Sequence, residues 1–177
     1  MLLGIISDTH DRLAAIDEAL RFFAFKNVDT VVHCGDWKSL STLIYFIEQA
    51  AELQLPVRGV LGNNDLDVDG FKAYMLNAPG DAQVIEGVMS MNLDGLSINM
   101  YHGHHAPTLR KVRSMDTADI LFLGHTHKPL IERVSKKLIV NPGSTAFAIP
   151  RSKQWKPSVA LMDVDTMTAS IEYLELT

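Results

Sequence analysis

Five short polar clusters in this sequence carry side chains that could bind a metal ion. They are Asp8 with His10, Asp36, Asn63 to Asp65, His102 to His105, and His125 with His127. Carboxylate, imidazole and amide groups are the ligands that divalent cations take in proteins. Asp8 and His10 are two positions apart, as are His125 and His127, and in extended backbone such side chains share a face. The clusters therefore favour a metal-dependent site.

Each cluster taken alone has a simpler structural explanation. Asp8 or Asp11 could cap a following helix, and Gly35-Asp36 could be an ordinary turn. A single histidine is more often a hydrogen-bonded structural residue than a ligand. We interpret His33 in this way, because it lies in an apolar strand, and we expect it to donate to a neighbouring backbone group. The combination shifts the balance, because five of the seven histidines fall in only two clusters.

The elements that must position these clusters alternate between strands and helices in the first half of the chain. Short apolar runs predict strands over 2–6, 31–34 and 57–61, and apolar residues at helical spacing predict helices over 13–25 and 40–53. Ser39 is the expected N-cap of the second helix. Such a βαβαβ order implies parallel strands with right-handed crossovers. Each polar cluster follows a predicted strand, and ligand sites gather at the carboxyl ends of strands in such sheets.

The second half of the chain is richer in strands. We predict strands over 84–86, 88–93, 96–101, 120–123, 130–134, 138–140, 159–164 and 169–174. A short helix is expected after Pro107, and Asp94-Gly95 is a hairpin turn signal. Together the two halves predict an α/β (α+β) fold, a four-layer αββα sandwich of two packed mixed β-sheets flanked by helices. We expect residues 1–177 to form a single domain.

Composition narrows the class of protein further. The formal net charge of −5 argues against a surface for duplex nucleic acid, which usually shows a basic excess. Cys34 is the single cysteine, so no intrachain disulfide is possible. No apolar run approaches the ~20 residues that span a bilayer, and the N-terminal apolar run lacks the basic flank of a signal peptide. We therefore expect a cytoplasmic protein with no membrane partner.

The order of the motifs resembles the calcineurin-like metallophosphoesterase superfamily. The sequence carries Asp-x-His, Gly-Asp, Gly-Asn-x-Asp, His-Gly-His and Gly-His-Thr-His in that order along the chain. The short chain and the later motif from Asn141 to Ser144 are similar to the small phosphodiesterases of the YfcE type. The resemblance covers nearly the whole chain.

This resemblance implies a specific ligand set for two metal ions. The first ion would be held by Asp8, His10, Asp36 and His127. Asp36 would bridge to a second ion completed by Asn63, His102 and His125. The implied reaction is hydrolysis of a small phosphodiester by a hydroxide that bridges the two ions. Mn²⁺ is the expected metal, with Ni²⁺, Fe, Zn²⁺ or Mg²⁺ as alternatives.

One position departs from the pattern of larger superfamily members. Where those proteins carry a histidine that is thought to protonate the leaving group, this chain has Asn64. We therefore expect a preference for leaving groups of low pKa, or protonation by His104 or by water. His104 could equally support a ligand or be merely exposed. Asp65 is expected to orient ligands, and Arg12 is a candidate for contact with phosphate.

Two other functions remain open on the sequence. The retromer scaffold subunit of eukaryotes shares the fold and binds proteins, but it departs from the metal pattern at the positions that hold Asp36 and Asn63 here. A phosphomonoesterase or pyrophosphatase is the other alternative. Similar proteins are often dimers or tetramers, so we expect a homo-oligomer, with Phe71, Tyr74 and Met75 as a candidate apolar interface.

Overall fold

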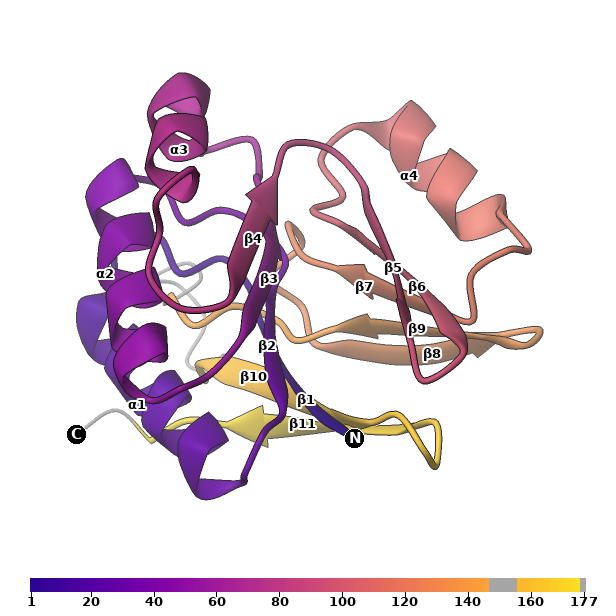
Figure 1. Ribbon diagram of the computed structural model, residues 1–177. Helices are drawn as coiled ribbons and strands as arrows, with labels where there is room; N and C mark the ends of the chain where they lie inside the picture. The colour runs from indigo at the N-terminus through magenta and orange to yellow at the C-terminus, as the bar shows by residue number, and fades with distance from the viewer. Residues whose placement is uncertain (147–155, 176–177) are drawn as a thin grey trace.

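The computed structural model describes residues 1–146 and 156–175, and these form two mixed β-sheets packed face to face (Figure 1). The first sheet has the strand order β11-β10-β1-β2-β3-β4. Its strands are β1 (Leu2–Ile6), β2 (Thr30–His33), β3 (Val57–Val60), β4 (Ala82–Ile85), β10 (Ser158–Asp163) and β11 (Thr168–Tyr173). The four strands β1 to β4 are parallel, and β10 and β11 are antiparallel additions.

The second sheet has the strand order β5-β6-β7-β9-β8. Its strands are β5 (Met89–Leu93), β6 (Leu96–Tyr101), β7 (Ile120–Leu123), β8 (Leu130–Val134) and β9 (Lys137–Asn141). The strands β6, β7 and β9 run parallel, whereas β5 and β8 pair by hairpins at the two edges. Both sheets therefore present the carboxyl ends of several parallel strands.

The helices lie on the two outer faces (Figure 1). The first sheet is covered by α1 (Leu13–Phe25), α2 (Leu40–Glu52) and α3 (Val68–Met75), and the second by α4 (Ala106–Ser114). Three groups of buried apolar residues fill the three spaces between layers: helices on the first sheet, sheet on sheet, and α4 on the second sheet. The predicted four-layer αββα sandwich is confirmed.

The central strands show why their sequences read as unbroken apolar runs. In β2 and β7 every residue is buried, and in β1 only Leu2 is partly exposed. A strand that has a helix layer on one face and a second sheet on the other needs apolar side chains on both. Ser39 caps α2 as predicted, since its hydroxyl accepts the Thr42 N–H at 3.3 Å.

The segment after β3 differs from the sequence analysis in one additional helix and in the position of Phe71. Helix α3 was not predicted, because it is eight residues long, contains Gly70 and fully buries only Phe71. Phe71, Tyr74 and Met75 were expected at an interface between copies of the chain. Phe71 instead lies in the core beneath the helices, with Tyr74 and Met75 packed against it. Phe71 is therefore buried within the molecule, whereas Tyr74 and Met75 are partly exposed, and a homo-oligomer stays a prediction.

Lys137 also lies elsewhere than predicted. It lies between the predicted strands 130–134 and 138–140, but it begins β9 and is buried. Its Nζ donates to the carbonyl oxygens of Val112, Arg113 and Met115 at 3.2, 2.8 and 2.5 Å. These carbonyls lie at the C-terminal end of α4, where they have no partner within the helix and where a cation is favoured by the helix dipole.

No helix in the described part of the chain is long and apolar enough to cross a membrane.

Candidate metal centre

The polar clusters come together where the carboxyl ends of the two sheets meet. Asp8 follows β1, Asp36 follows β2, and the Asn63–Asp65 turn follows β3 in the first sheet. His102 directly follows β6, and the Gly124–His127 loop follows β7 in the second. Cross-sheet hydrogen bonds join the two edges, since the His125 N–H donates to Asp8 Oδ2 at 3.0 Å. Segments more than 100 residues apart in sequence thus share one site.

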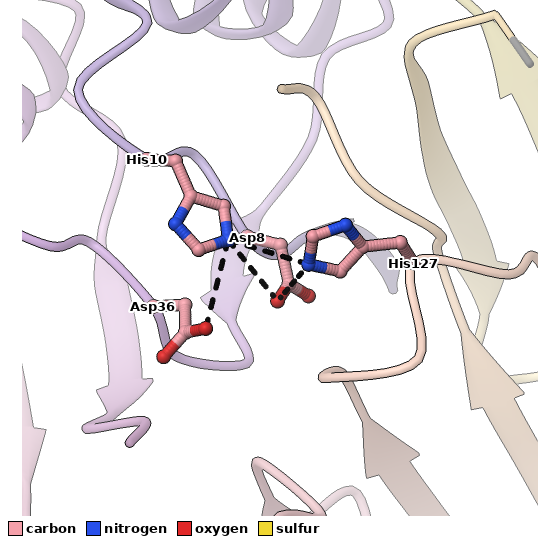
Figure 2. A group of neighbouring side chains, drawn as sticks. All are labelled: Asp8, His10, Asp36 and His127. Atoms are coloured by element: carbon pink, nitrogen blue, oxygen red, sulfur yellow. Dashed lines mark hydrogen bonds and ion pairs between the residues drawn. The ribbon is translucent and has the colours of Figure 1, made fainter. Parts of the chain in front are cut away.

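Four of the seven expected ligands form a compact group (Figure 2). One donor atom from each of Asp8, His10, Asp36 and His127 lies within 4.8 Å of the others. His127 Nε2 is 3.1 Å from Asp8 Oδ1. His10 Nε2 is 3.6 Å from Asp36 Oδ2 and 3.3 Å from His127 Nε2. The side chains of two imidazoles and two carboxylates point toward one another.

The remaining expected ligands lie on the other side of Asp36. His102 Nε2 is 3.3 Å from Asp36 Oδ1, and the rings of His102 and His125 are 5.2 Å apart between centroids. Asn63 is exposed in the turn after β3. Asp36 therefore has one oxygen near the His10 group and the other near His102, which is the arrangement a bridging carboxylate requires. The second ligand set as a whole stays a prediction.

The donor atoms are arranged as metal ligands would be. Asp8 Oδ1 and His102 Nε2 are both buried, and neither has a hydrogen-bond partner among the described residues. His102 Nδ1 is 2.8 Å from the Cys34 carbonyl oxygen. Because a carbonyl can only accept, Nδ1 carries the proton and Nε2 turns its lone pair toward Asp36. Metal-bound histidines are commonly fixed by such a backbone contact. Buried acceptors that face one another are costly unless a cation lies between them, so the residues fit a metal centre.

The backbone of the site is held in an unusual conformation. Five of the seven expected ligands have positive φ angles between 43° and 67°: Asp8, His10, Asp36, His125 and His127. Such angles are uncommon outside glycine, and they persist where the surroundings impose them, often at functional sites. Gly62 allows the closest approach, because a Cβ there would clash with the Asp36 carboxylate. The sequence analysis gave no sign of these positive φ angles in the ligands.

Charge interactions hold the carboxylates ionised. Burial opposes ionisation of Asp36, but the nearby His102 and the hydrogen bonds from Asn64 lower its pKa to about 2. Burial likewise opposes ionisation of Asp8, but contacts with His10 and His127 bring its pKa well below the usual range. The pKa of His127 is raised, chiefly by its contact with Asp8. Protons and metal ions therefore compete for the same histidine nitrogens.

Asp65, which lies outside the ligand set, positions two of the loops. Asp65, which was expected to orient ligands, accepts the backbone N–H groups of Asp36 and Gly62 at 3.0 and 2.7 Å through Oδ2. Its Oδ1 accepts the N–H of Lys38 at 2.6 Å. A single buried carboxylate thus ties the loop after β2 to the turn after β3, which fixes Asp36 between them.

His33 has a more specific role than expected. We expected it to donate to the backbone, but its Nδ1 accepts the Gly35 N–H at 3.1 Å. Nε2 therefore carries the proton and faces Thr9 Oγ1 at 3.3 Å. The ring stacks on Trp37 with centroids 3.4 Å apart. Burial lowers the pKa of His33 to about 3, so the ring is neutral at pH 7. Through Gly35 and Thr9, His33 links the two loops that carry Asp36, Asp8 and His10.

The motif near the end of the described chain also supports the site. Asn141 Nδ2 donates to the Gly124 carbonyl at 2.7 Å, and Ser144 Oγ donates to the Asp8 carbonyl at 2.9 Å. The sequence marked this motif only by resemblance, and the structure gives it a physical role. It holds the ligand loops after β1 and β7 in place.

The residues expected near substrate lie around this centre. Asn64 Nδ2 donates to Asp36 Oδ2 at 2.6 Å, and its backbone N–H donates to Oδ1 at 2.9 Å. His104 is exposed, with its ring 5.5 Å from that of Tyr101 and 5.6 Å from that of His102. Arg12 lines a hollow beside His10 and His127. Asn64 thus orients Asp36, and His104 borders the second side of the site.

Comparison with known proteins identifies the family. The sequence model of the calcineurin-like phosphoesterase superfamily domain matches residues 1–167. The chain therefore belongs to the calcineurin-like phosphoesterase superfamily, as its motifs indicated. A phosphodiesterase of Methanocaldococcus jannaschii is 34% identical to it over 176 residues, covering 99% of this chain and 98% of the relative. A probable metallophosphoesterase of Bacillus subtilis, YsnB, is 29% identical and covers 97% and 89%.

Solved structures show the same fold. A structure described as a novel archaeal phosphodiesterase superposes with a TM-score of 0.85 at 30% identity, covering 98% of this chain and 100% of that one. The phosphoesterase YfcE of E. coli gives 0.68 at 22% identity, covering 99% and 100%. Vps29 of Entamoeba histolytica, in a complex with Zn²⁺, gives 0.66 at 20% identity and covers 100% of each chain. The last two likenesses establish the fold alone.

Proposed function

We propose that this protein is a metal-dependent phosphodiesterase whose site holds two divalent ions bridged by Asp36. The observation that carries the proposal is the convergence of donor atoms from both sheets around Asp36. Two of these atoms, Asp8 Oδ1 and His102 Nε2, are buried and have no hydrogen-bond partner in the part of the chain that the structure describes. The phosphodiesterase relative at 34% identity supports the same class of reaction. The proposed substrate of this protein is a small phosphodiester.

The chain's own residues define what each side of the site would do. Asp8, His10, Asp36 and His127 would hold one ion, and Asp36, Asn63, His102 and His125 the other. When bound, two such ions lower the pKa of water toward neutrality and neutralise the charge of a phosphoester. Asn64 holds both oxygens of Asp36 by its side chain and backbone. This fixes the carboxylate in the orientation that a shared ligand needs.

His104 is the proposed donor of a hydrogen bond to the leaving oxygen. It stands between the His102 side of the centre and a hollow lined by Tyr101, Gly62 and Leu61. Partial desolvation and the nearby His102 lower the pKa of His104 below its ordinary value, which favours the neutral ring at pH 7. A neutral imidazole donates one N–H but is a poor source of a full proton at that pH. The proposal therefore includes a preference for leaving groups of low pKa.

Hydrolysis of bis(p-nitrophenyl) phosphate tests the function. The metal-free protein should be inactive in chelator and should gain activity with Mn²⁺. Asp36→Asn should remove nearly all activity, because Asp36 contacts both ligand groups. Asp94→Asn is the matched control, since Asp94 is exposed in the β5–β6 turn with a similar positive φ. Absence of metal-dependent turnover in wild-type protein would favour a non-catalytic scaffold.

Phosphomonoester and pyrophosphate hydrolysis can be separated in the same assay. p-Nitrophenyl phosphate and bis(p-nitrophenyl) phosphate release the same chromophore, so their kcat/KM values compare directly. A diesterase should favour the diester. A preference for the monoester would reassign the protein as a phosphomonoesterase, and release of phosphate from pyrophosphate would reassign it as a pyrophosphatase.

A further inference from the structure

A hollow of about 290 Å³, the His104 hollow, adjoins the metal centre through Gly62 and His104. A Cβ on Gly62 would clash with the Asp36 carboxylate, and the His104 ring lies 5.6 Å from the ring of His102. Sites for drug-sized molecules usually measure about 300–1,000 Å³. The His104 hollow therefore has room for one small group of a substrate whose phosphate lies at the centre.

The walls of the His104 hollow combine apolar side chains with aromatic rings. Leu61 and Val68 line it beside Tyr101 and His104. The rings of Tyr101 and His104 lie 5.5 Å apart between centroids, with 38° between their planes. His104 is exposed, so its ring is open to a bound group. Such walls suit a planar ring, because aromatic pairs attract each other beyond the effect of the apolar area they bury.

The wall that carries His104 is fixed by hydrogen bonds. The Tyr101 side chain is buried, and its hydroxyl accepts the His105 N–H at 3.0 Å. His105 Nδ1 lies 2.9 Å from Thr108 Oγ1, and both residues line the same hollow. The segment from β6 into α4 therefore holds this wall in place before a ligand arrives, which reduces the cost of binding.

The lining of the His104 hollow offers no partner for an anionic group. Among the described residues that line it, Glu86 is the only carboxylate, and no lysine or arginine is present. The Glu86 carboxylate is already paired with Lys72 Nζ at 2.9 Å. An anionic group would meet a carboxylate and apolar walls. The lining therefore suits an uncharged group.

We propose that the His104 hollow binds an uncharged planar ring on the leaving arm of the substrate, with Val68 as a residue that determines this specificity. His104 is the proposed hydrogen-bond donor to the leaving oxygen, and because it also lines the hollow, the arm that leaves is the arm that enters it. A ring joined directly to that oxygen is a phenol-type alcohol, which is also a leaving group of low pKa. The substrate class is then an aryl phosphodiester. This inference rests on the proposed phosphodiesterase function.

A series of methyl phosphodiesters that differ only in the leaving alcohol tests this specificity. The alcohols are phenol, hexafluoroisopropanol, which is similarly acidic but has no ring, and meta-hydroxybenzoate, which adds a carboxylate to the ring. Dividing each kcat/KM by the rate constant for hydroxide-catalysed hydrolysis of the same ester removes differences in intrinsic reactivity. Wild-type protein should favour the phenyl ester about tenfold over each of the other two, since burial and stacking of a ring contribute on this order.

Val68→Asp changes the wall at a position where a carboxylate is tolerated, because Val68 is the first residue of α3 and anions are favoured there. The variant should lose most of the tenfold preference for the phenyl ester over the hexafluoroisopropyl ester. It should also gain a preference for an ester of meta-(trimethylammonio)phenol, whose ring is cationic, and misfolding cannot produce such a gain. Val134→Asp is the matched control, since it makes the same exchange at an exposed valine on the edge strand β8. It should leave all ratios unchanged.

The outcomes separate the specificity from the function. Equal corrected kcat/KM values for the phenyl and hexafluoroisopropyl esters in wild-type protein would overturn the ring specificity and leave the proposed function standing. A higher corrected value for a thymidine ester than for the phenyl ester would overturn direct attachment of the ring. Failure of wild-type protein to hydrolyse any diester would instead remove the proposed function.

Binding of phosphonates, whose carbon–phosphorus bond is not hydrolysed, shows where the ring lies. Phenylphosphonate carries the ring and methylphosphonate lacks it. In NMR spectra of Zn²⁺-loaded protein, phenylphosphonate should shift the backbone amide signals of Gly87 and Thr108, which line the His104 hollow, more than methylphosphonate does. Ring-dependent shifts at Arg12 and Ala146 instead, in the hollow beside His10, or shifts in neither hollow, would overturn the proposal.

Discussion

His33 gives a prediction that links the metal loops to the stability of the fold. The folded ring is buried and neutral, with its pKa lowered to about 3, whereas the unfolded chain has the ordinary value of 6.5. Because the unfolded state takes up the proton first as pH falls, stability is lost from about pH 6.5 downward. The loss is complete only when the folded ring also protonates, near pH 3.

The size of the effect follows from the two pKa values. Between pH 7.5 and pH 5.0 the pH falls about 1.5 units below the pKa of the unfolded ring, which becomes protonated, while the folded ring stays neutral. At about 1.36 kcal/mol per unit, the free energy of unfolding should fall by roughly 2 kcal/mol over this interval. Protonation would also remove the acceptor at Nδ1 that binds the Gly35 N–H.

Urea denaturation of the metal-free protein at the two pH values measures this loss. His33→Asn keeps an acceptor near Gly35 but cannot titrate, so the pH-dependent loss should be about 2 kcal/mol smaller in this variant. His105→Asn, which replaces an exposed histidine, is the control and should keep the wild-type dependence. Identical pH dependence in wild-type protein and His33→Asn would refute the buried, neutral state of His33.

Three further predictions concern the metal centre and the outer layer. Saturating Mn²⁺, at about 100 times its dissociation constant, should raise the free energy of unfolding by about 2.7 kcal/mol per site; thermal melts with equal midpoints in chelator and in Mn²⁺ would speak against metal binding to the folded state. Lys137→Met should cost about 1–3 kcal/mol in urea denaturation, because three carbonyls at the end of α4 lose their donor; a loss under about 0.5 kcal/mol would show that water replaces it. Asn64→His should raise the rate of hydrolysis of diesters with poor leaving groups relative to that of diesters with good ones. If the ratio of these two rates equals that of wild-type protein, the chain lacks no proton donor at this position.

Much of the fold was predictable because its central strands and first two helices have strong local patterns. The strands at 2–6, 96–101, 120–123 and 130–134 and the helix at 13–25 have the predicted boundaries. Buried strands need apolar runs, and α1 and α2 need apolar stripes, so packing leaves a clear trace in sequence. Helix α3 escaped prediction because one buried residue in eight leaves almost none.

Four of the seven expected ligands, Asp8, His10, Asp36 and His127, could be predicted as neighbours, but the interactions that support them could not. Metal-binding side chains stand out by type and by their position after strands. The supporting contacts of His33 and Asp65 join loops distant in sequence, and a single polar residue carries no sign of its partner.

The central claim is that Asp36 is shared between two metal ions, and crystals grown with Mn²⁺ test it most directly. Anomalous diffraction should show two Mn²⁺ peaks within bonding distance of the Asp36 carboxylate. One should lie among Asp8, His10 and His127, and the other beside His102 and His125. A single peak, or peaks that Asp36 does not contact, would contradict the claim.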